Sequence, residues 1–157
     1  MKISKVVIMI NRTKSHARQT ASALKAFLDH EKVQQQWIET LPPQKHLQRS
    51  RSALRDRSVD LVIAVGGDGT LLQAAHRFRG SGLPILGINI GYLGFITSIP
   101  GDRVRQEMRR VLNAEFVLSH RTALDLEIHQ SKRTTTAWAL NDVLITRGVL
   151  KALAVRE

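Results

Sequence analysis

The chain has 157 residues, of which 43% are hydrophobic and 24% are charged, so it is long and apolar enough to form one buried core. It contains no cysteine, which excludes a disulfide framework, thiolate metal sites and cysteine nucleophiles and favours a reducing compartment such as the cytoplasm. Its longest apolar run falls far short of roughly 18 residues, so no membrane-spanning helix is expected.

The formal net charge is +11, and residues 1–60 carry 12 Lys and Arg against 5 Asp and Glu. Because no aromatic residues are interleaved with these charges for base stacking, we interpret them as a solvated helical surface rather than a nucleic-acid interface. The same positive field would still attract polyphosphate substrates. The six histidines show no metal-binding spacing, and no metal site is predicted from them.

Strands and helices are predicted to alternate along most of the chain. Continuous apolar runs indicate buried strands of a parallel sheet at residues 6–10, 59–65 and 84–90, with an edge-like strand at 33–39. Composition and the spacing of apolar residues indicate helices at 15–30, 71–78 and 102–112, and a basic surface helix at 45–57. This order predicts a three-layer α/β fold, with a mostly parallel, Rossmann-like sheet flanked by helices.

The pattern changes near residue 115. Residues 122–129 alternate between apolar and polar, as a half-buried antiparallel strand requires, and residues 138–146 are predicted to form a second such strand. We therefore predict an α/β domain at 1–114 and the beginning of a β-rich domain at 115–157. Since an isolated hairpin is marginal in water, we expect further strands, absent from this sequence or supplied by another chain, to complete it.

A glycine-rich turn, Gly66-Gly67-Asp68-Gly69-Thr70, follows the clearest predicted strand and precedes a predicted helix. Glycines in such a turn let backbone N–H groups approach phosphate oxygens, and the helix N-terminus adds partial positive charge. The turn is not a Walker A loop, because it lacks Gly-Lys-Ser/Thr, and Leu72 replaces the third glycine of a dinucleotide fingerprint. A tight turn that merely needs small residues is the structural alternative.

Asp68 favours a phosphotransferase over that alternative. A carboxylate among phosphate-binding glycines repels phosphate unless it holds a metal ion or takes a proton from an attacking hydroxyl. The Thr70 hydroxyl could bind phosphate or cap the following helix.

The glycine turn resembles a motif shared by NAD kinases, diacylglycerol-type lipid kinases and 6-phosphofructokinases. Residues 87–97, Gly-Ile-Asn-Ile-Gly-Tyr-Leu-Gly-Phe-Ile-Thr, resemble a loop of the NAD kinases, and residues 139–145, Ala-Leu-Asn-Asp-Val-Leu-Ile, resemble their Asn-acidic motif. Three segments in this order identify the chain as similar to the amino-terminal portion of an NAD kinase. It departs from the usual pattern at Ile90, Tyr92 and Asp142, where Thr, a polar residue such as His, and Glu are common.

The resemblance implies roles for individual residues. Asp68 would be the base for the 2′-hydroxyl of the adenosine ribose of NAD. The remaining implied contacts are Gly67, Gly69 and Thr70 around the phosphates, Asn89 and Phe95 in the dinucleotide pocket, and Asn141 and Asp142 on the hydroxyls of NAD. Phe95 could instead be a core residue and Asn141 a turn residue.

The resemblance also implies ATP or polyphosphate as phosphoryl donor, a divalent metal such as Mg²⁺, NADP as product, and a homo-oligomer in the full-length form. The family continues into a β-rich domain with a segment rich in glycine, serine and threonine, and no such segment precedes Glu157. We therefore expect a truncated NAD kinase with little or no activity alone. The alternatives are a lipid or sugar kinase of the same superfamily and a non-catalytic nucleotide-binding module.

Overall fold

The computed structural model describes residues 2–13, 16–40, 58–91, 94–130, 133–140, 142–146 and 152–155. The chain divides into two compact units, Met1–Leu118 and Ser119–Glu157, and each is described by itself. The basic helix predicted at 45–57 lies outside the described residues. Within the described part of the chain, no helix is long and apolar enough to cross a membrane.

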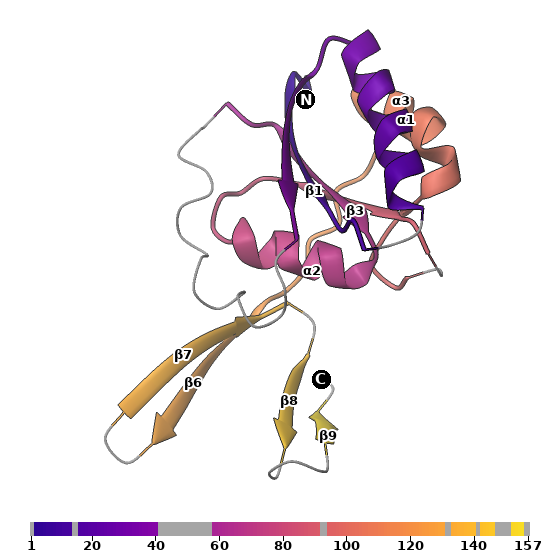
Figure 1. Ribbon diagram of the computed structural model, residues 1–157. Coiled ribbons are helices and arrows are strands. Elements are labelled where there is room, and N and C mark those ends of the chain that lie inside the picture. Colours follow the sequence, from indigo (N-terminus) through magenta and orange to yellow (C-terminus); the bar gives the residue numbers. More distant parts are fainter. Residues whose placement is uncertain are drawn as a thin grey trace. The chain divides into compact units, whose positions relative to one another are not determined.

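A five-stranded parallel sheet forms the centre of the first unit (Figure 1). Its strands lie in the order β2-β1-β3-β4-β5, so the chain builds outward from β1 first to one side and then to the other. Their bounds are β1 Lys5–Ile10, β2 Gln34–Glu39, β3 Leu61–Gly66, β4 Ile85–Asn89 and β5 Ile99–Pro100. The parallel sheet and the edge position of the second strand confirm the predictions.

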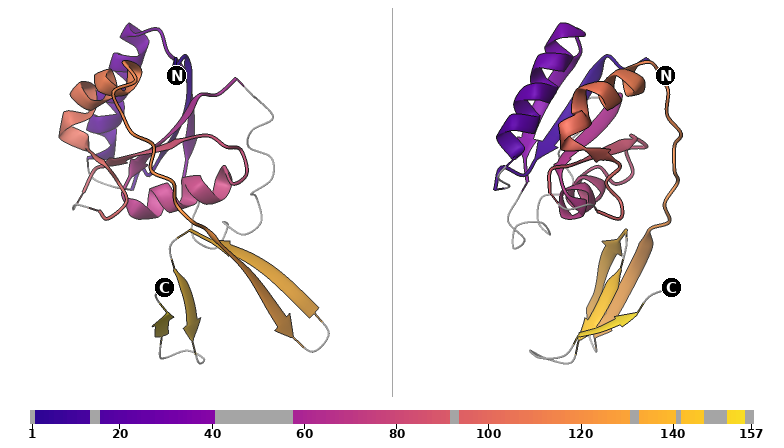
Figure 2. Two further views of the ribbon diagram at one scale, coloured as in Figure 1. Left: turned by 180° about the vertical axis from the view of Figure 1, so that it is seen from behind. Right: turned by 90° about the vertical axis from the view of Figure 1, so that its right-hand side faces the viewer.

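Helices cover both faces of this sheet, which confirms the three-layer prediction (Figures 1 and 2). The helices are α1 Ala17–His30, α2 Asp68–Arg77 and α3 Val104–Leu112, and the short 3₁₀ helix Gly101–Arg103 leads into α3. Alternate residues of the central strands, including Ile8 and Ile63, form one core with α1 and α3. On the opposite face Leu71 of α2 packs against Gly87 of β4. The continuous apolar runs of β1 and β3 therefore arise because both faces of these strands are buried.

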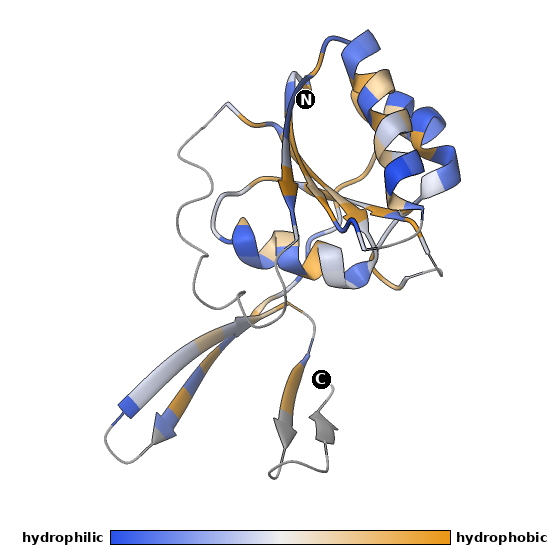
Figure 3. Ribbon diagram, in the orientation of Figure 1, coloured by the Kyte–Doolittle hydropathy of each residue, from blue (hydrophilic) through white to orange (hydrophobic). Residues whose placement is uncertain are grey.

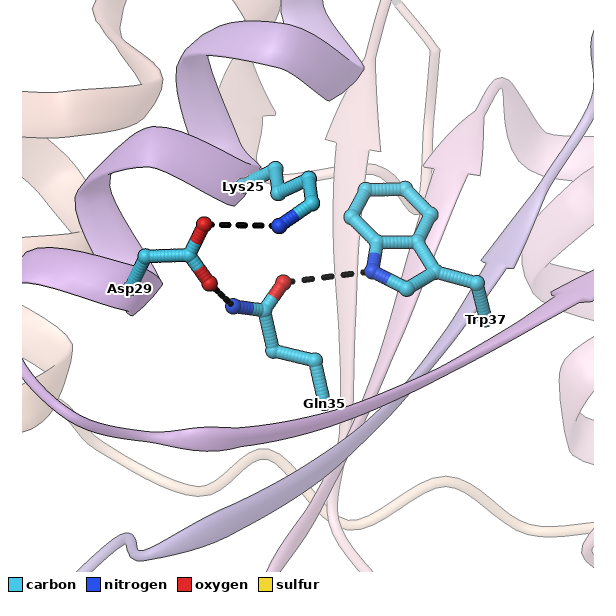
Figure 4. A network of polar contacts seen from close by, with 4 residues as sticks. All are labelled: Lys25, Asp29, Gln35 and Trp37. Atoms are coloured by element: carbon cyan, nitrogen blue, oxygen red, sulfur yellow. Dashed lines mark hydrogen bonds and ion pairs between the residues drawn. The ribbon is translucent and has the colours of Figure 1, made fainter.

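A chain of polar contacts joins α1 to the edge strand β2 (Figure 4). Asp29 accepts hydrogen bonds from Lys25 Nζ at 2.7 Å and from Gln35 Nε2 at 2.6 Å, and Trp37 Nε1 donates to Gln35 Oε1 at 3.1 Å. The Lys25 hydrogen bond is the main reason that the pKa of Asp29 lies below its usual value. These contacts attach β2, which as an edge strand has one neighbour in the sheet, to the helix beside it.

Helices α1 and α3 are each followed, two residues after their last residue, by a left-handed residue that is not glycine. Lys32 has φ 57° and Ala114 has φ 62°. At each end the left-handed residue and the one after it donate to carbonyls of the last turn: Lys32 to Asp29, Ala114 to Val111, and Glu115 to Arg110 at 2.9 Å. This hydrogen-bond pattern usually has glycine at the left-handed position, because a Cβ there is strained.

The second unit contains two antiparallel strand pairs. β6 Leu124–Gln130 pairs with β7 Arg133–Ala139, and β8 Val143–Thr146 pairs with β9 Ala152–Val155. The antiparallel strand predicted at residues 122–129 is confirmed as β6, and hydrophilic and hydrophobic residues alternate along it in Figure 3. The prediction that it is half-buried is not borne out within the described residues, since Leu124 and Ile128 are 38% and 47% exposed. The single strand predicted at 138–146 is wrong, because the chain leaves β7 after Ala139 and a new strand begins at Val143. The sequence did not reveal the break between β7 and β8, because the residues on both sides of it are apolar.

Candidate active site

The carboxyl ends of β1, β3 and β4 meet at one edge of the sheet. The Asn11 backbone N–H donates to the carbonyl of Val65 at 3.0 Å, and Ile90 N–H donates to that of Gly66 at 2.8 Å. The strand order reverses between β1 and β3, directly beside the glycine turn. In open parallel sheets, ligands bind outside the carboxyl ends of the strands at such a reversal, so this edge is the candidate site.

Helix α2 begins inside the glycine motif rather than after it. The predicted start at Leu71 is three residues late, since Asp68 is the first residue of α2 and Gly67 is its N-cap. Thr70 therefore lies within the first turn, and the alternative that its hydroxyl caps the helix is excluded. Its side chain is 3% exposed, and a Cβ on Gly66 would overlap its hydroxyl and lie 2.7 Å from its Cβ. Gly66 is thus a packing requirement of the turn.

Gly67 and Gly69 differ from Gly66 in having no such requirement. A Cβ built on either residue would meet no protein atom within 4 Å. Neither residue has positive φ, and Gly67 adopts an extended conformation with φ −151°. An alanine would therefore fit at both positions as far as the described protein atoms are concerned. Space beside these two glycines is open to a ligand.

The Asp68 carboxylate is held by the backbone of a second loop. Its Oδ2 accepts a hydrogen bond from Phe95 N–H at 2.8 Å. Its Oδ1 accepts from Ile96 N–H at 3.2 Å and from both the N–H and the hydroxyl of Thr97 at 3.1 Å. Burial raises the pKa of Asp68, but the hydrogen bonds from Phe95, Thr97 and Ile96 together outweigh it, so the pKa lies below its usual value. Asp68 is therefore ionised at neutral pH.

A glycine at position 94 allows the second loop to pass close to the Asp68 carboxylate. A Cβ on Gly94 would overlap Oδ1 of Asp68 and would lie 2.8 Å from its Cγ and 2.6 Å from Thr97 Oγ1. Gly94 is therefore required where the loop crosses the carboxylate. Phe95, the next residue, is 99% exposed, which excludes the alternative that it is a core residue.

Asn89 lies at the end of β4, where it is the sheet partner of Gly66. It is 7% exposed, and its Oδ1 accepts a hydrogen bond from Gly91 N–H at 2.9 Å. The first unit therefore brings Asn89 to the same sheet edge as the glycine turn. Asn141 lies outside the described residues, and Asp142 is an exposed residue of the second unit, directly before β8.

Two residues of this edge have roles that the sequence did not predict. Thr97, 7% exposed, supplies two of the four hydrogen bonds to Asp68. Asn11 lies directly after β1, and its side-chain Oδ1 accepts hydrogen bonds from the N–H and the hydroxyl of Thr13, two residues later, at 3.0 and 2.7 Å. The position of Asn11, as a polar residue directly after a buried strand, could have indicated from the sequence that it lies at this edge. Thr97 has no local signal, because its partner is 29 residues away.

The described residues contain no group of three or more His, Cys, Asp or Glu side chains that could hold a metal ion. The described residues therefore do not form a protein-held metal site.

The chain matches the family model of the ATP-NAD kinase N-terminal domain over residues 4–116. It belongs to the NAD kinase family. The NAD kinase of Corynebacterium diphtheriae is 41% identical over 109 residues, which cover 66% of this chain and 34% of that protein. The NAD kinase of Syntrophobacter fumaroxidans is 28% identical over 146 residues, which cover 92% of this chain and 52% of that protein. The family match does not favour the lipid or sugar kinase alternative.

The fold is also similar to that of a solved NADH kinase. The crystal structure of yeast NADH kinase complexed with NADH has a TM-score of 0.65 and 19% identity, and the similarity covers 92% of this chain and 48% of that one. The chain thus spans about one third to one half of the length of these relatives.

Proposed function

We propose that this chain provides the phosphoryl-transfer part of an NAD kinase site. The reaction would move a phosphoryl group from ATP or polyphosphate to the 2′-hydroxyl of the adenosine ribose of NAD, giving NADP. The observation that carries the proposal is the pair of sterically unconstrained glycines, Gly67 and Gly69, on either side of the ionised Asp68 at the start of α2.

A helix disfavours glycine, which costs about 0.5–1 kcal/mol relative to alanine in a helix interior. Gly69 lies within α2, yet neither packing nor backbone conformation requires it. A ligand that approaches the backbone closely supplies the missing reason. The unpaired N–H groups of a helix N-terminus favour a phosphate in that space.

Asp68 is suited to receive the proton of the acceptor hydroxyl. In the proposed step, the 2′-oxygen forms a bond to the γ-phosphorus, the bond from that phosphorus to the β,γ-bridging oxygen breaks, and ADP leaves. The hydroxyl proton passes to the Asp68 carboxylate and then to solvent. Because its pKa is low, Asp68 acts chiefly by accepting the hydroxyl hydrogen bond and orienting the oxygen, and it carries the proton only briefly.

A divalent ion such as Mg²⁺ would enter on the ATP phosphates as part of the substrate. Mg²⁺ is commonly bound in this way, through substrate phosphates and water rather than through an all-protein site. This assignment is consistent with described residues that offer no cluster of metal ligands.

The NAD-binding assignments rest on the family resemblance together with the exposure of individual residues. The backbone N–H of Phe95 contacts Asp68, and its aromatic side chain is exposed, so a flat ring of the dinucleotide could cover it. Asn89 would support the loop and line the pocket, and Asn141 with Asp142 would contact hydroxyls of NAD. On the family resemblance alone, we also propose a homo-oligomeric assembly and a cytoplasmic location for the whole protein.

The direct test is NADP formation from NAD, ATP and Mg²⁺, with polyphosphate as a second donor. It should be run on the 157-residue chain and on the protein expressed from its complete reading frame. Asp68→Asn should lower kcat by about 100-fold or more, the contribution of a general base. Asp60→Asn is the matched control, because Asp60 also accepts backbone hydrogen bonds but lies before β3, at the amino edge of the sheet.

Asp60→Asn should leave kcat close to that of the parent. An equal loss of activity in the two variants would show that Asp68 acts only through folding. A folded protein that binds NAD but forms no NADP with either donor would favour the non-catalytic binding module.

A further inference from the structure

We propose that Thr97 is a positioning residue that anchors Oδ1 of Asp68, so that Oδ2 is the oxygen that receives the acceptor hydroxyl. This inference rests on the proposed function and makes the two carboxylate oxygens unequal.

The distribution of donors over the two oxygens supports this assignment. Among the described residues, Oδ1 accepts hydrogen bonds from three donors at 3.1–3.2 Å, whereas Oδ2 accepts one, from Phe95 N–H at 2.8 Å. A carboxylate oxygen offers about two lone-pair positions. Oδ1 is therefore saturated, and Oδ2 keeps a position for a further donor. The acceptor hydroxyl of a substrate would be that donor.

Thr97 is held in place from two sides by glycines. A Cβ on Gly87 would lie 2.9 Å from Thr97 Cγ2 and 3.0 Å from its Cα, so the threonine methyl packs directly on β4. A Cβ on Gly94 would lie 2.6 Å from Thr97 Oγ1. The β-branched side chain also has few rotamers, and it is 7% exposed. The hydroxyl is thereby fixed in its direction toward Asp68.

Packing alone does not require a hydroxyl at this position. Valine has nearly the same shape as threonine and would fill the space against Gly87 equally well. A buried hydroxyl costs free energy unless it is hydrogen-bonded, and here it donates to a charged oxygen. The choice of threonine over valine is thus explained by the carboxylate that it orients.

The test compares Thr97→Val, which keeps the methyl and removes the hydroxyl, with Thr97→Ser, which keeps the hydroxyl and removes the methyl. Both are made in the protein expressed from its complete reading frame. We expect Thr97→Val to lower kcat about 10- to 100-fold while the KM values for ATP and NAD stay within about twofold, since one hydrogen bond to a charged group is lost. Thr97→Ser should retain kcat despite its lower thermal stability.

A second readout does not depend on activity. Titration of the Asp68 carboxyl carbon by NMR should show a higher pKa in Thr97→Val than in the parent, because the lost hydrogen bond favours the ionised form. In Thr97→Ser the pKa of Asp68 should return to that of the parent.

The two proposals fail in different ways. A parent protein that binds NAD and ATP but forms no NADP would overturn the proposed function. An Asp68 pKa that is the same in Thr97→Val as in the parent would overturn the anchoring role whatever the activity. A Thr97→Val protein that loses thermal stability but keeps the parental kcat would show that Thr97 is only structural.

Discussion

Replacing Gly69 by alanine should stabilise the protein and impair its activity at the same time. Gly69 is the second residue of α2, its φ is not positive, and a Cβ there would contact no protein atom within 4 Å. The substitution should therefore raise the free energy of unfolding by about 0.5–1 kcal/mol, from helix propensity and a less flexible unfolded chain. For a protein of this size, that corresponds to a rise in Tm of about 1–4 °C.

The same methyl group would occupy the space assigned to the substrate phosphates. A displacement of the reacting groups by about 1 Å can cost about 100-fold in rate, so we expect a fall of that order in kcat/KM for NADP formation. The two measurements are thermal unfolding followed by circular dichroism and initial rates with NAD, ATP and Mg²⁺.

Gly66→Ala is the matched control, because its Cβ would lie 2.7 Å from Thr70 Cβ. It should lose about 1–3 kcal/mol of stability through overpacking. A Gly69→Ala protein with unchanged kcat/KM would refute the reasoning, and the turn would then be a tight connection with no phosphate beside it. A destabilised Gly69→Ala protein would contradict the open geometry of the turn.

Four other outcomes can be checked by unfolding. Ala114→Gly should raise stability by about 1 kcal/mol in urea titrations, because it removes the strain of a left-handed non-glycine residue. Met108→Ala, at a fully buried site, should cost about 2–5 kcal/mol by the same measurement. Asp60→Ala should cost about 1–3 kcal/mol, since its carboxylate accepts hydrogen bonds from Ser4 and Lys5. The pKa values of Asp60 and Asp68 both lie below normal, that of Asp60 chiefly because of the Ser4 N–H hydrogen bond. The ionised carboxylates therefore stabilise the folded protein fully above about pH 4, and this contribution is lost as the pH falls through the lowered pKa values. The free energy of unfolding, measured at successive pH values, should fall in this range, and in Asp60→Ala it should fall less steeply with pH.

The layers of the first unit, and the sheet edge that carries the candidate site, could be predicted from the amino-acid sequence. Continuous apolar runs can be satisfied only by strands buried on both faces, which is why residues 6–10 and 59–65 predicted β1 and β3. The glycine motif between a strand and a helix likewise predicted where backbone N–H groups would face a ligand. These features depend on neighbours in the chain, and local patterns therefore reveal them.

The organisation of the candidate site depends on tertiary contacts that local sequence patterns do not reveal. Asp68 is oriented by donors 27 to 29 residues away, and Thr97 supplies two of them. Gly66 and Gly69 look equivalent in the sequence, but Gly66 is crowded by Thr70 and Gly69 is open. The break between β7 and β8 depends in the same way on which strands pair. Distances between residues far apart in the chain are set by packing, which no local periodicity encodes.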